Sequence, residues 1–313
     1  MTKPDISFIA DLEAIVRSRL DEGAVESYTA RLAASGTRRI AQKVGVLNRV
    51  QLCHPPIEPV APVSDEVFPV KRTAAEACPR YLCRIVRGID PAAVTPQWMQ
   101  EKLRRSGLRP IHPVVDVTNI VMLELGQPLH GFDLDTLDGG IVVRMGEAGE
   151  QLTLLDERVI ELDPDMLVIA DHGGPRALAG IMGGETSGVE AETRNVFFEG
   201  AFFSPGVIAG RARRLGLHTD ASMRFERGVD PAGQRRAIER ATRLLMQIAG
   251  GQAGPVIEVA SQSHLPGRQT VSLRRGRLAG GRRRGRPEPH PARPGGGGAG
   301  TAPRRRPQRR RAA

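Results

Sequence analysis

The apolar residues of this chain follow two different periods. Residues 6–20 carry apolar side chains at helical spacing with charged residues between them, so this segment predicts an amphipathic helix. Residues 81–89 alternate apolar and polar side chains instead, which is the period of a strand. The chain therefore combines helix-forming and strand-forming segments.

Short strand-like runs dominate after residue 110. They occupy residues 114–119, 141–145, 152–155, 159–162, 166–170 and 195–203. Two of them flank Asp156-Glu157-Arg158 and predict a hairpin. Because strands and a few helices follow one another without strict strand–helix alternation, we expect an α+β fold built on a mixed sheet.

Two later helices are indicated by a capping residue followed by proline. Thr95-Pro96 and Asp230-Pro231 each place an oxygen-bearing side chain before a proline, which suits the first helical position. Gly107 and the pair Gly250-Gly251 stand where these helices would end. We therefore expect one helix from about residue 96 and another from about residue 231.

The two ends of the chain differ from the middle in composition. Residues 46–79 are rich in proline and predict an extended connector between a helical segment, 1–45, and the strand-rich part. Beyond about residue 274 the chain consists mainly of Arg, Pro, Gly and Ala. Such a segment cannot bury enough apolar surface to offset the entropy of ordering, so residues 279–313 predict a disordered basic tail.

The tail also explains the net charge. The chain has a formal charge of +10, and residues 268–313 contain 15 arginines and one acid, Glu288. The remainder is therefore mildly acidic.

The chain contains no apolar run long enough for a membrane span and no basic-then-apolar signal at its start. Three cysteines without a CxxC pair fit a reducing compartment, so we expect a cytoplasmic protein.

Five stretches in the middle of the chain carry a family resemblance. They are VVDVTNIVMLELGQPLHGFD (114–133), IMGGETSGV (181–189), FFEGAFFSP (197–205), GRARRLGLHTDASMRFERGVDP (210–231) and AGGQAGPV (249–256). Their order and spacing resemble the central tRNA-editing domain of bacterial phenylalanyl-tRNA synthetase beta subunits, over residues 80–259. The resemblance implies hydrolysis of tyrosine wrongly esterified to tRNA(Phe), with tRNA(Phe) and the synthetase alpha subunit as partners. It implies no cofactor here, since ATP and magnesium serve other domains.

Glu199 is the residue whose surroundings suggest a binding role. It stands among Phe197, Phe198, Phe202 and Phe203, where a carboxylate is costly unless it has a hydrogen-bond partner. A tyrosine hydroxyl could be that partner, whereas phenylalanine could not. The structural alternative is a carboxylate that accepts backbone amides or pairs with an arginine such as Arg211. The resemblance favours the binding role.

The resemblance also implies roles for other polar and small residues. His130 would line the editing pocket and orient water or the ester, and Thr219 would stand at the pocket wall. Their structural alternatives are a satisfied turn histidine and a helix cap. We expect Thr118, Asn119, Gly183 and Ala221 to contact the substrate, with the two small residues leaving space for it. Together with catalytic His130, Glu199 and Thr219 they form the candidate site, which includes no metal ligands.

The flanking segments depart from the beta-subunit pattern. LEAIVRSRL and ESYTARLAASGTRRIAQKVG, within residues 12–45, resemble the opening of phosphoribosyl-ATP pyrophosphatase, but VLNRVQL follows where that enzyme has its acidic magnesium-binding helix. We therefore reject that activity. Residues 260–278 resemble the truncated start of the next beta-subunit domain. The arginine-rich remainder is either GC-rich DNA read out of frame or a genuine RNA-binding tail.

Three functions follow from these patterns. The first is an editing-domain fragment that hydrolyses Tyr-tRNA(Phe), with docking of the alpha subunit lost. The second is a non-catalytic RNA-binding or assembly fragment with the same fold. The third and weakest is the histidine-pathway hydrolase, supported by residues 1–45 alone.

Overall fold

The computed structural model describes residues 57–267, and these residues form an α+β fold. One five-stranded sheet has the order β1-β4-β7-β8-β9 and is mixed, because β1 runs parallel to β4 and the other neighbours are antiparallel. Its strands are β1 (Val70–Arg72), β4 (Ile141–Met145), β7 (Leu167–Asp171), β8 (Gly174–Leu178) and β9 (Met182–Gly183). The α+β mixed-sheet prediction is confirmed for this part of the chain.

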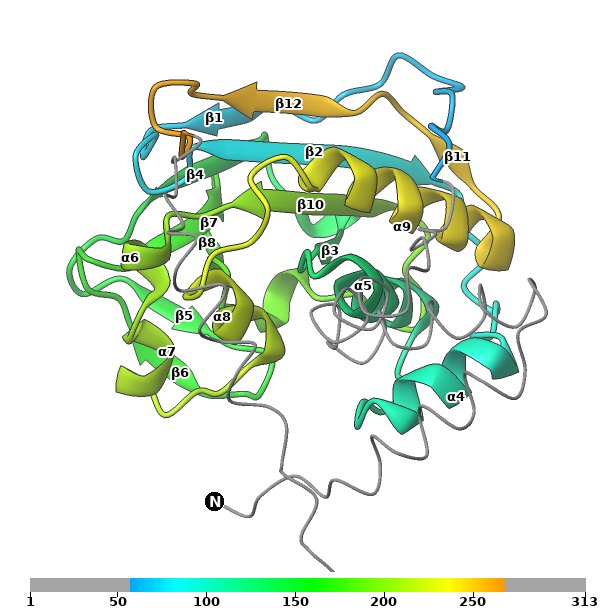
Figure 1. Ribbon diagram of the computed structural model, residues 1–313, viewed down its shortest axis with the longest axis horizontal. Coiled ribbons are helices and arrows are strands. Elements are labelled where there is room, and N and C mark those ends of the chain that lie inside the picture. The colour runs from blue at the N-terminus through cyan, green and yellow to red at the C-terminus, as the bar shows by residue number, and fades with distance from the viewer. Residues whose placement is uncertain (1–56, 268–313) are drawn as a thin grey trace, which may run out of the picture. The chain divides into compact units, whose positions relative to one another are not determined.

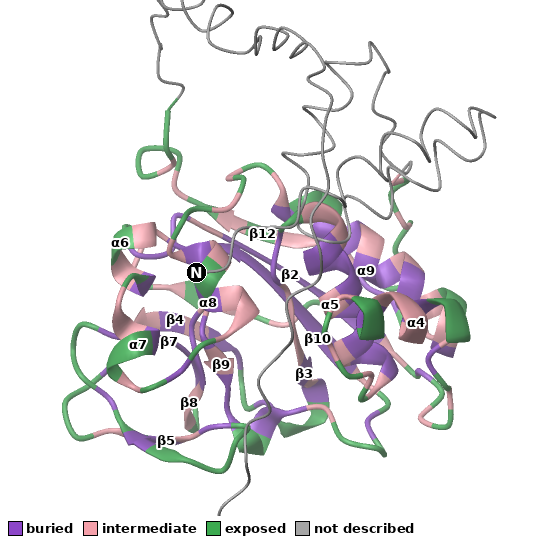
Figure 2. Ribbon diagram, turned by 60° about the horizontal axis from the view of Figure 1, so that its bottom comes forward, coloured by how far each residue is buried: buried purple, intermediate pink, exposed green. Residues whose placement is uncertain are grey.

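The second sheet is antiparallel and lies between two apolar cores. Its order is β11-β2-β10-β3, with β12 also paired to β2. Its strands are β2 (Arg80–Arg87), β3 (His130–Asp133), β10 (Val196–Phe202), β11 (Gln252–Ala253) and β12 (Ile257–Ala260). One face packs toward the mixed sheet, and helices α5 (Pro113–Leu125) and α9 (Gln234–Ala249) cover the other (Figure 1). The central strands and the inner sides of both helices are buried (Figure 2).

Smaller elements complete the domain. The predicted hairpin is present, formed by β5 (Gln151–Thr153) and β6 (Val159–Glu161). The short helices α6 (Pro205–Ile208), α7 (Arg211–Arg214) and α8 (Asp220–Phe225) follow β10, and α4 (Gln97–Arg105) precedes α5. The expected connector contains β1. The predictions for residues 1–45 and 279–313 lie outside the described residues.

One predicted strand, residues 114–119, is wrong because it is the first half of α5. His112 accepts a hydrogen bond from the Val114 N–H, Pro113 occupies the first turn, and Gly126 ends the helix in the left-handed conformation. Most of this helix is buried, so its apolar run lacks the polar positions that would reveal helical periodicity.

Both capping predictions name the wrong capping residue, although α4 does begin about where it was expected. The Thr95 hydroxyl donates to an Asp116 carboxylate oxygen at 2.6 Å instead of capping α4. The Asp230 carboxylate accepts from the Ala232 N–H in a turn, and α9 begins only at Gln234. Gly250 does end α9, as predicted. The predicted signals therefore locate two helices correctly but fail on the residues that open them.

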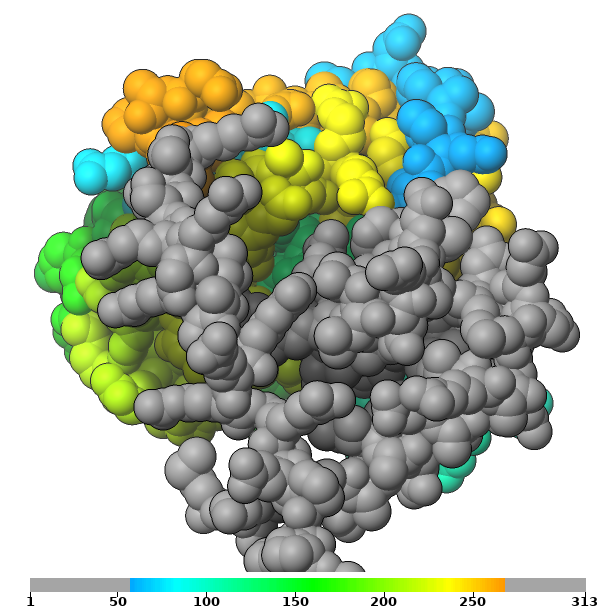
Figure 3. Space-filling view, viewed as in Figure 1, coloured from blue at the N-terminus to red at the C-terminus, as the bar shows by residue number. Residues whose placement is uncertain are grey.

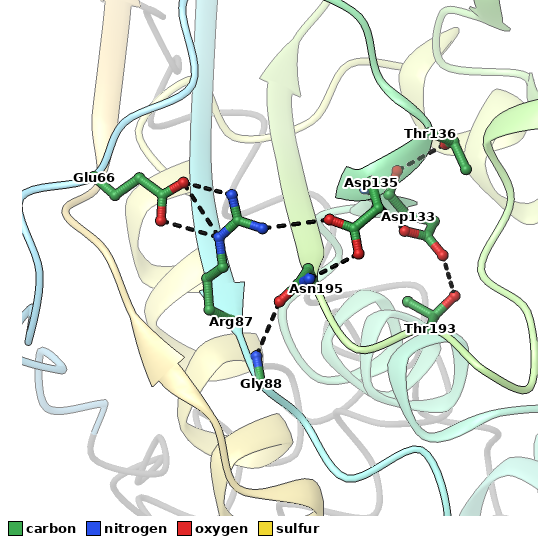
Figure 4. A network of polar contacts seen from close by, with 8 residues as sticks. All are labelled: Glu66, Arg87, Gly88, Asp133, Asp135, Thr136, Thr193 and Asn195. Atoms are coloured by element: carbon green, nitrogen blue, oxygen red, sulfur yellow. Dashed lines mark hydrogen bonds and ion pairs between the residues drawn. The ribbon is translucent and has the colours of Figure 1, made fainter.

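The start of the described chain is hydrogen-bonded to α9 and to strands β2 and β11 of the antiparallel sheet. Figure 3 shows this segment (blue) against α9 (yellow). Figure 4 shows Arg87 of β2 paired with Glu66 and with Asp135, whose other oxygen accepts from the Asn195 amide at 2.7 Å. The Gly88 N–H in turn donates to Asn195. This network fixes the ends of β2, β3 and β10 and so holds the strands that carry the candidate site.

Candidate functional site

Strand β10 directs alternate residues to the two cores. Phe197 and Ala201 belong to the core shared with the mixed sheet, whereas Val196 and Phe198 belong to the helical core. By this period of two, Glu199 shares the face of Phe197 and Ala201. In the register, Glu199 stands opposite His130 of β3 and Cys83 of β2. Side chains directly opposite one another on neighbouring strands lie on the same face, so this pairing assembles the site.

Glu199 is buried and has few polar contacts. Its side chain accepts a hydrogen bond from the Tyr81 hydroxyl at 3.4 Å, which is long for an O–H···O bond. Burial raises the pKa of Glu199 to about 8, and the Tyr81 bond acts in the opposite direction. The carboxyl group is therefore largely protonated at neutral pH. Arg211, the alternative partner, instead pairs with Asp165 at 3.3 Å.

His130 carries a buried nitrogen without a bonding partner. Its Nε2 meets no hydrogen-bond partner among residues 57–267. The ring packs edge-on against Phe132, with 4.3 Å between ring centroids. Burial lowers the pKa of His130 to about 4, so the imidazole is neutral at pH 7. A neutral ring with a free nitrogen can donate to or accept from water or a ligand, depending on its tautomer.

These two side chains border the same small cavity, of about 70 Å³. His130, Glu199, Gly183, Ala221 and Phe225 are among the residues that line it. Gly183 is required by close packing, because a Cβ there would lie 2.6 Å from Cε1 of His130. The structure therefore brings together four of the residues singled out from the sequence. The volume gives room for a few water-sized groups.

Thr219 does not line this cavity but secures its wall. Its hydroxyl accepts from the Ser222 N–H, which caps α8, and donates to the Ile181 carbonyl oxygen at 3.0 Å. Ile181 lines the cavity, as does Ala221 in the first turn of α8. The cap therefore holds α8 against the cavity in a position where Ala221 faces it.

Thr118 and Asn119 lie elsewhere. Both are in α5, where the Thr118 hydroxyl donates to the Val115 carbonyl oxygen at 2.8 Å. Neither residue lines the cavity. Their expected place at a strand end depended on the wrong strand at 114–119. The structure thus separates these two residues from the other five.

Tyr81 is the residue near the site that the sequence analysis missed. It is 1% exposed and lies two residues before Cys83, so it shares the face of Glu199 on the neighbouring strand. The alternation in residues 81–89 indicates which residues share a face with Tyr81. Nothing in that alternation indicates that this strand pairs with the strand of Glu199.

A wider groove of about 610 Å³ lies beside the cavity. Thr219, Asp220 and Ser222 line the groove. Ala221, which stands between Asp220 and Ser222 in the sequence, lines the cavity instead. The start of α8 therefore forms a wall between the two hollows. Arg213 also lines the groove and makes no ion pair within residues 57–267.

The described residues contain no cluster of three or more His, Cys, Asp or Glu side chains that could hold a metal ion. Cys78 and Cys83 are buried free thiols, and burial together with the nearby Glu199 raises the pKa of Cys83 to about 12. The thiol group is therefore protonated and unreactive. Within residues 57–267, each helix is too short or too polar to cross a membrane.

The fold and the cavity define an α+β domain with a buried acid in its pocket, and comparison with known proteins gives the family. The B3/4 domain family matches residues 77–250. The phenylalanine–tRNA ligase beta subunit of Pectobacterium atrosepticum is 57% identical over 262 residues, 83% of this chain and 33% of that protein. The Nitrosococcus oceani beta subunit is 60% identical over 239 residues, 76% of this chain and 30% of that protein.

This chain belongs to the B3/4 domain family. The resemblance to the central domain of phenylalanyl-tRNA synthetase beta subunits is confirmed. The chain spans about a third of the length of these curated relatives. An N-terminal fragment of the Pyrococcus horikoshii phenylalanyl-tRNA synthetase beta subunit is similar at 15% identity and a TM-score of 0.42, over 74% of this chain and 65% of that one. At that score the likeness carries no argument.

Proposed function

We propose that this chain hydrolyses tyrosine esterified to tRNA(Phe), as the editing domain of a phenylalanine–tRNA ligase beta subunit. The observation that carries the proposal is Glu199, a buried carboxyl group with one long hydrogen bond that borders a cavity. Natural proteins pair most of their buried polar groups, so an under-bonded acid beside a cavity is suited to bind a polar ligand.

Glu199 would distinguish tyrosine from phenylalanine through the phenol hydroxyl. A protonated carboxyl group donates one hydrogen bond and still accepts others, so it can bond a phenol in either direction. A bare phenyl ring would leave the acid without that bond. Sites that hydrogen-bond a substrate hydroxyl reject the analogue without it by large factors, far larger than an apolar pocket achieves.

Hydrolysis would rely on positioning rather than on a strong base. His130 is neutral at pH 7, and its free Nε2 can orient a water molecule or the ester carbonyl. Holding water and ester in reacting geometry supplies a substantial part of the barrier reduction. The terminal ribose hydroxyls of the tRNA would assist the attack. In this proposal Thr219 acts through the position of α8.

The groove on the other side of α8 is the proposed path of the tRNA terminus. It adjoins the cavity at residues 219–222, so a nucleotide in the groove would present its ester to the cavity. Arg213 offers a guanidinium group that a phosphate could engage. Replacing Arg213 with Ala should weaken tRNA binding. It should also reduce the magnitude of the negative slope of log affinity against log salt concentration by about 0.7. Arg236→Ala, on an exposed part of α9, is the matched control and should leave the slope unchanged.

The direct test is deacylation of preformed Tyr-tRNA(Phe) by the full chain, with Phe-tRNA(Phe) as the control. We expect selective hydrolysis of the tyrosyl ester and its loss in Glu199→Ala. Equal rates for both esters, or unchanged rates in the variant, would contradict the recognition role. Folded protein that binds tRNA(Phe) without hydrolysis would favour the non-catalytic RNA-binding function.

The remaining sequence-based expectations are part of the same proposal. We expect no cofactor for editing by this chain, so deacylation should persist in EDTA, and loss of activity on chelation would contradict this. The alpha subunit would be the partner in the whole ligase, which works in the cytoplasm. Co-purification with a tagged alpha subunit measures whether docking is lost in this chain, as expected.

A further inference from the structure

Tyr81 and Glu199 form an isolated buried pair. The Tyr81 hydroxyl donates to Oε2 of Glu199 at 3.4 Å, and neither side chain makes another hydrogen bond within residues 57–267. They are 1% and 6% exposed. A buried phenol normally finds a polar partner, and here that partner is the acid of the candidate pocket.

Tyr81 and Glu199 differ in their position relative to the cavity. Glu199 lines the cavity, and Tyr81 does not. Tyr81 lies on β2, diagonal to Glu199 across the strand pair, since the directly opposite residue is Cys83. The carboxyl group therefore contacts Tyr81 through Oε2 and also borders the cavity, which Tyr81 does not line. A ligand in the cavity would reach the carboxyl group without displacing the Tyr81 ring.

We propose that Tyr81 is a positioning residue that holds Oε2 of Glu199 toward its own hydroxyl and so leaves the other oxygen, Oε1, for the phenol hydroxyl of the bound tyrosyl ester. This inference rests on the proposed editing function. With the acid protonated, Oε2 accepts from Tyr81 and the Oε1–H donates to the ligand oxygen. Without Tyr81 the carboxyl group could rotate, and both its oxygens would compete for the same ligand.

The test uses Tyr81→Phe in the full chain, which removes the hydroxyl and keeps the ring. Deacylation of Tyr-tRNA(Phe) and Phe-tRNA(Phe) is measured across pH for the wild type and the variant. We expect kcat/KM for the tyrosyl ester to fall roughly three- to tenfold, mainly through KM, since one hydrogen bond is lost. The phenylalanyl ester should be hydrolysed at an unchanged rate.

The pH profile separates positioning from simple packing. The Tyr81 bond lowers the pKa of Glu199, so its removal should shift the midpoint of the tyrosyl-ester profile upward. Cys83→Ala is the matched control, because Cys83 lies on the same face and strand but makes no hydrogen bond to Glu199. We expect no shift of its midpoint.

Each result has one meaning. Inactive wild-type protein would contradict the proposed editing function itself. Active wild type with an unchanged midpoint and tyrosyl-to-phenylalanyl ratio in Tyr81→Phe would overturn the inference alone. Should that variant not fold, ring-fluorinated tyrosine in a Tyr28→Phe background labels Tyr81 alone and makes its hydroxyl a stronger donor. The midpoint should then move downward, and an unmoved midpoint would again overturn the inference.

Discussion

Glu199 and Glu239 are both buried carboxyl groups at the same antiparallel sheet, on opposite faces, and their bonding differs. Oε2 of Glu239 on α9 accepts from the Arg84 guanidinium at 2.9 Å and from the Val60 N–H at 2.8 Å. Arg84 also donates to the Gly254 carbonyl oxygen at 2.7 Å and to that of Val60. Glu199 has the single long bond from Tyr81.

The difference separates a structural acid from the acid of the candidate site. The Arg84–Glu239 pair connects β2, α9 and the segment before β1, and it lines neither the cavity beside Glu199 nor the groove beside α8. A buried ion pair tolerates desolvation better when both partners make further hydrogen bonds, and here Glu239 also accepts from the Val60 N–H while Arg84 donates to two carbonyl oxygens. Glu199 keeps unused bonding capacity and borders a cavity, which is the condition for ligand binding.

The largest expected effect comes from breaking the structural pair. Arg84→Met leaves Glu239 buried without its cation, so the free energy of unfolding should fall by about 3–5 kcal/mol. Urea denaturation measures the change. The double variant Arg84→Met/Glu239→Leu removes the orphaned charge and should recover about half of the loss. A single variant as stable as the wild type would show that the pair is not structural.

The second prediction concerns stability against pH at Glu199. Its pKa is raised from 4.5 to about 8, so the folded state holds a proton that the unfolded state releases within this window. The contribution of Glu199 to stability is therefore full below pH 4.5, falls as pH rises to about 8, and is constant above it. Relative to Glu199→Gln, the wild type should lose up to about 1.4 kcal/mol per pH unit.

Urea denaturation of the wild type and Glu199→Gln at several pH values between 4.5 and 9 provides the measurement. A stability difference that does not change with pH would mean that Glu199 is ionised in the folded protein. His130 acts in the opposite direction, because its pKa is lowered to about 4 and stability is lost as pH falls below 6.5. The comparison with Glu199→Gln cancels the histidine contribution.

A smaller effect is expected on the cavity side from Gly183→Ala. The added Cβ would lie 2.6 Å from Cε1 of His130, so the ring must move away from its position beside Glu199. We expect a loss of about 1–3 kcal/mol in stability together with reduced deacylation. Gly206→Ala is the control, because a Cβ there meets no atom within 4 Å. Deacylation at the wild-type rate in Gly183→Ala would remove His130 from the proposed site.

The sequence revealed the parts of the molecule whose signals are local. The strand that contains Glu199 follows from a short strand-like run, and the hairpin around Asp156 and the end of α9 at Gly250 follow from turn chemistry. The first half of α5 was misassigned because a helix buried on most sides lacks polar positions. Thr118 was placed wrongly for the same reason.

The candidate site depended on contacts that no local pattern contains. His130 and Glu199 are adjacent because β3 and β10 pair in one register, and sequence alternation does not state which strands pair. Tyr81 was missed because it joins the site from a third strand. Glu199 could be singled out because an acid among phenylalanines is unusual in composition alone. The family resemblance then favoured a binding role for it.

The protonation state of Glu199 tests the central claim most directly. Difference infrared spectroscopy of the wild type minus Glu199→Gln resolves the carbonyl stretch of one protonated carboxyl group. We predict that this signal is present at pH 6 and disappears with a midpoint near pH 8. This is the behaviour of a buried carboxyl group that is protonated at neutral pH and can donate to a hydroxyl ligand. Absence of the signal at pH 6, with a midpoint near the ordinary value of 4.5, would show an ionised and solvated carboxylate and would contradict the claim.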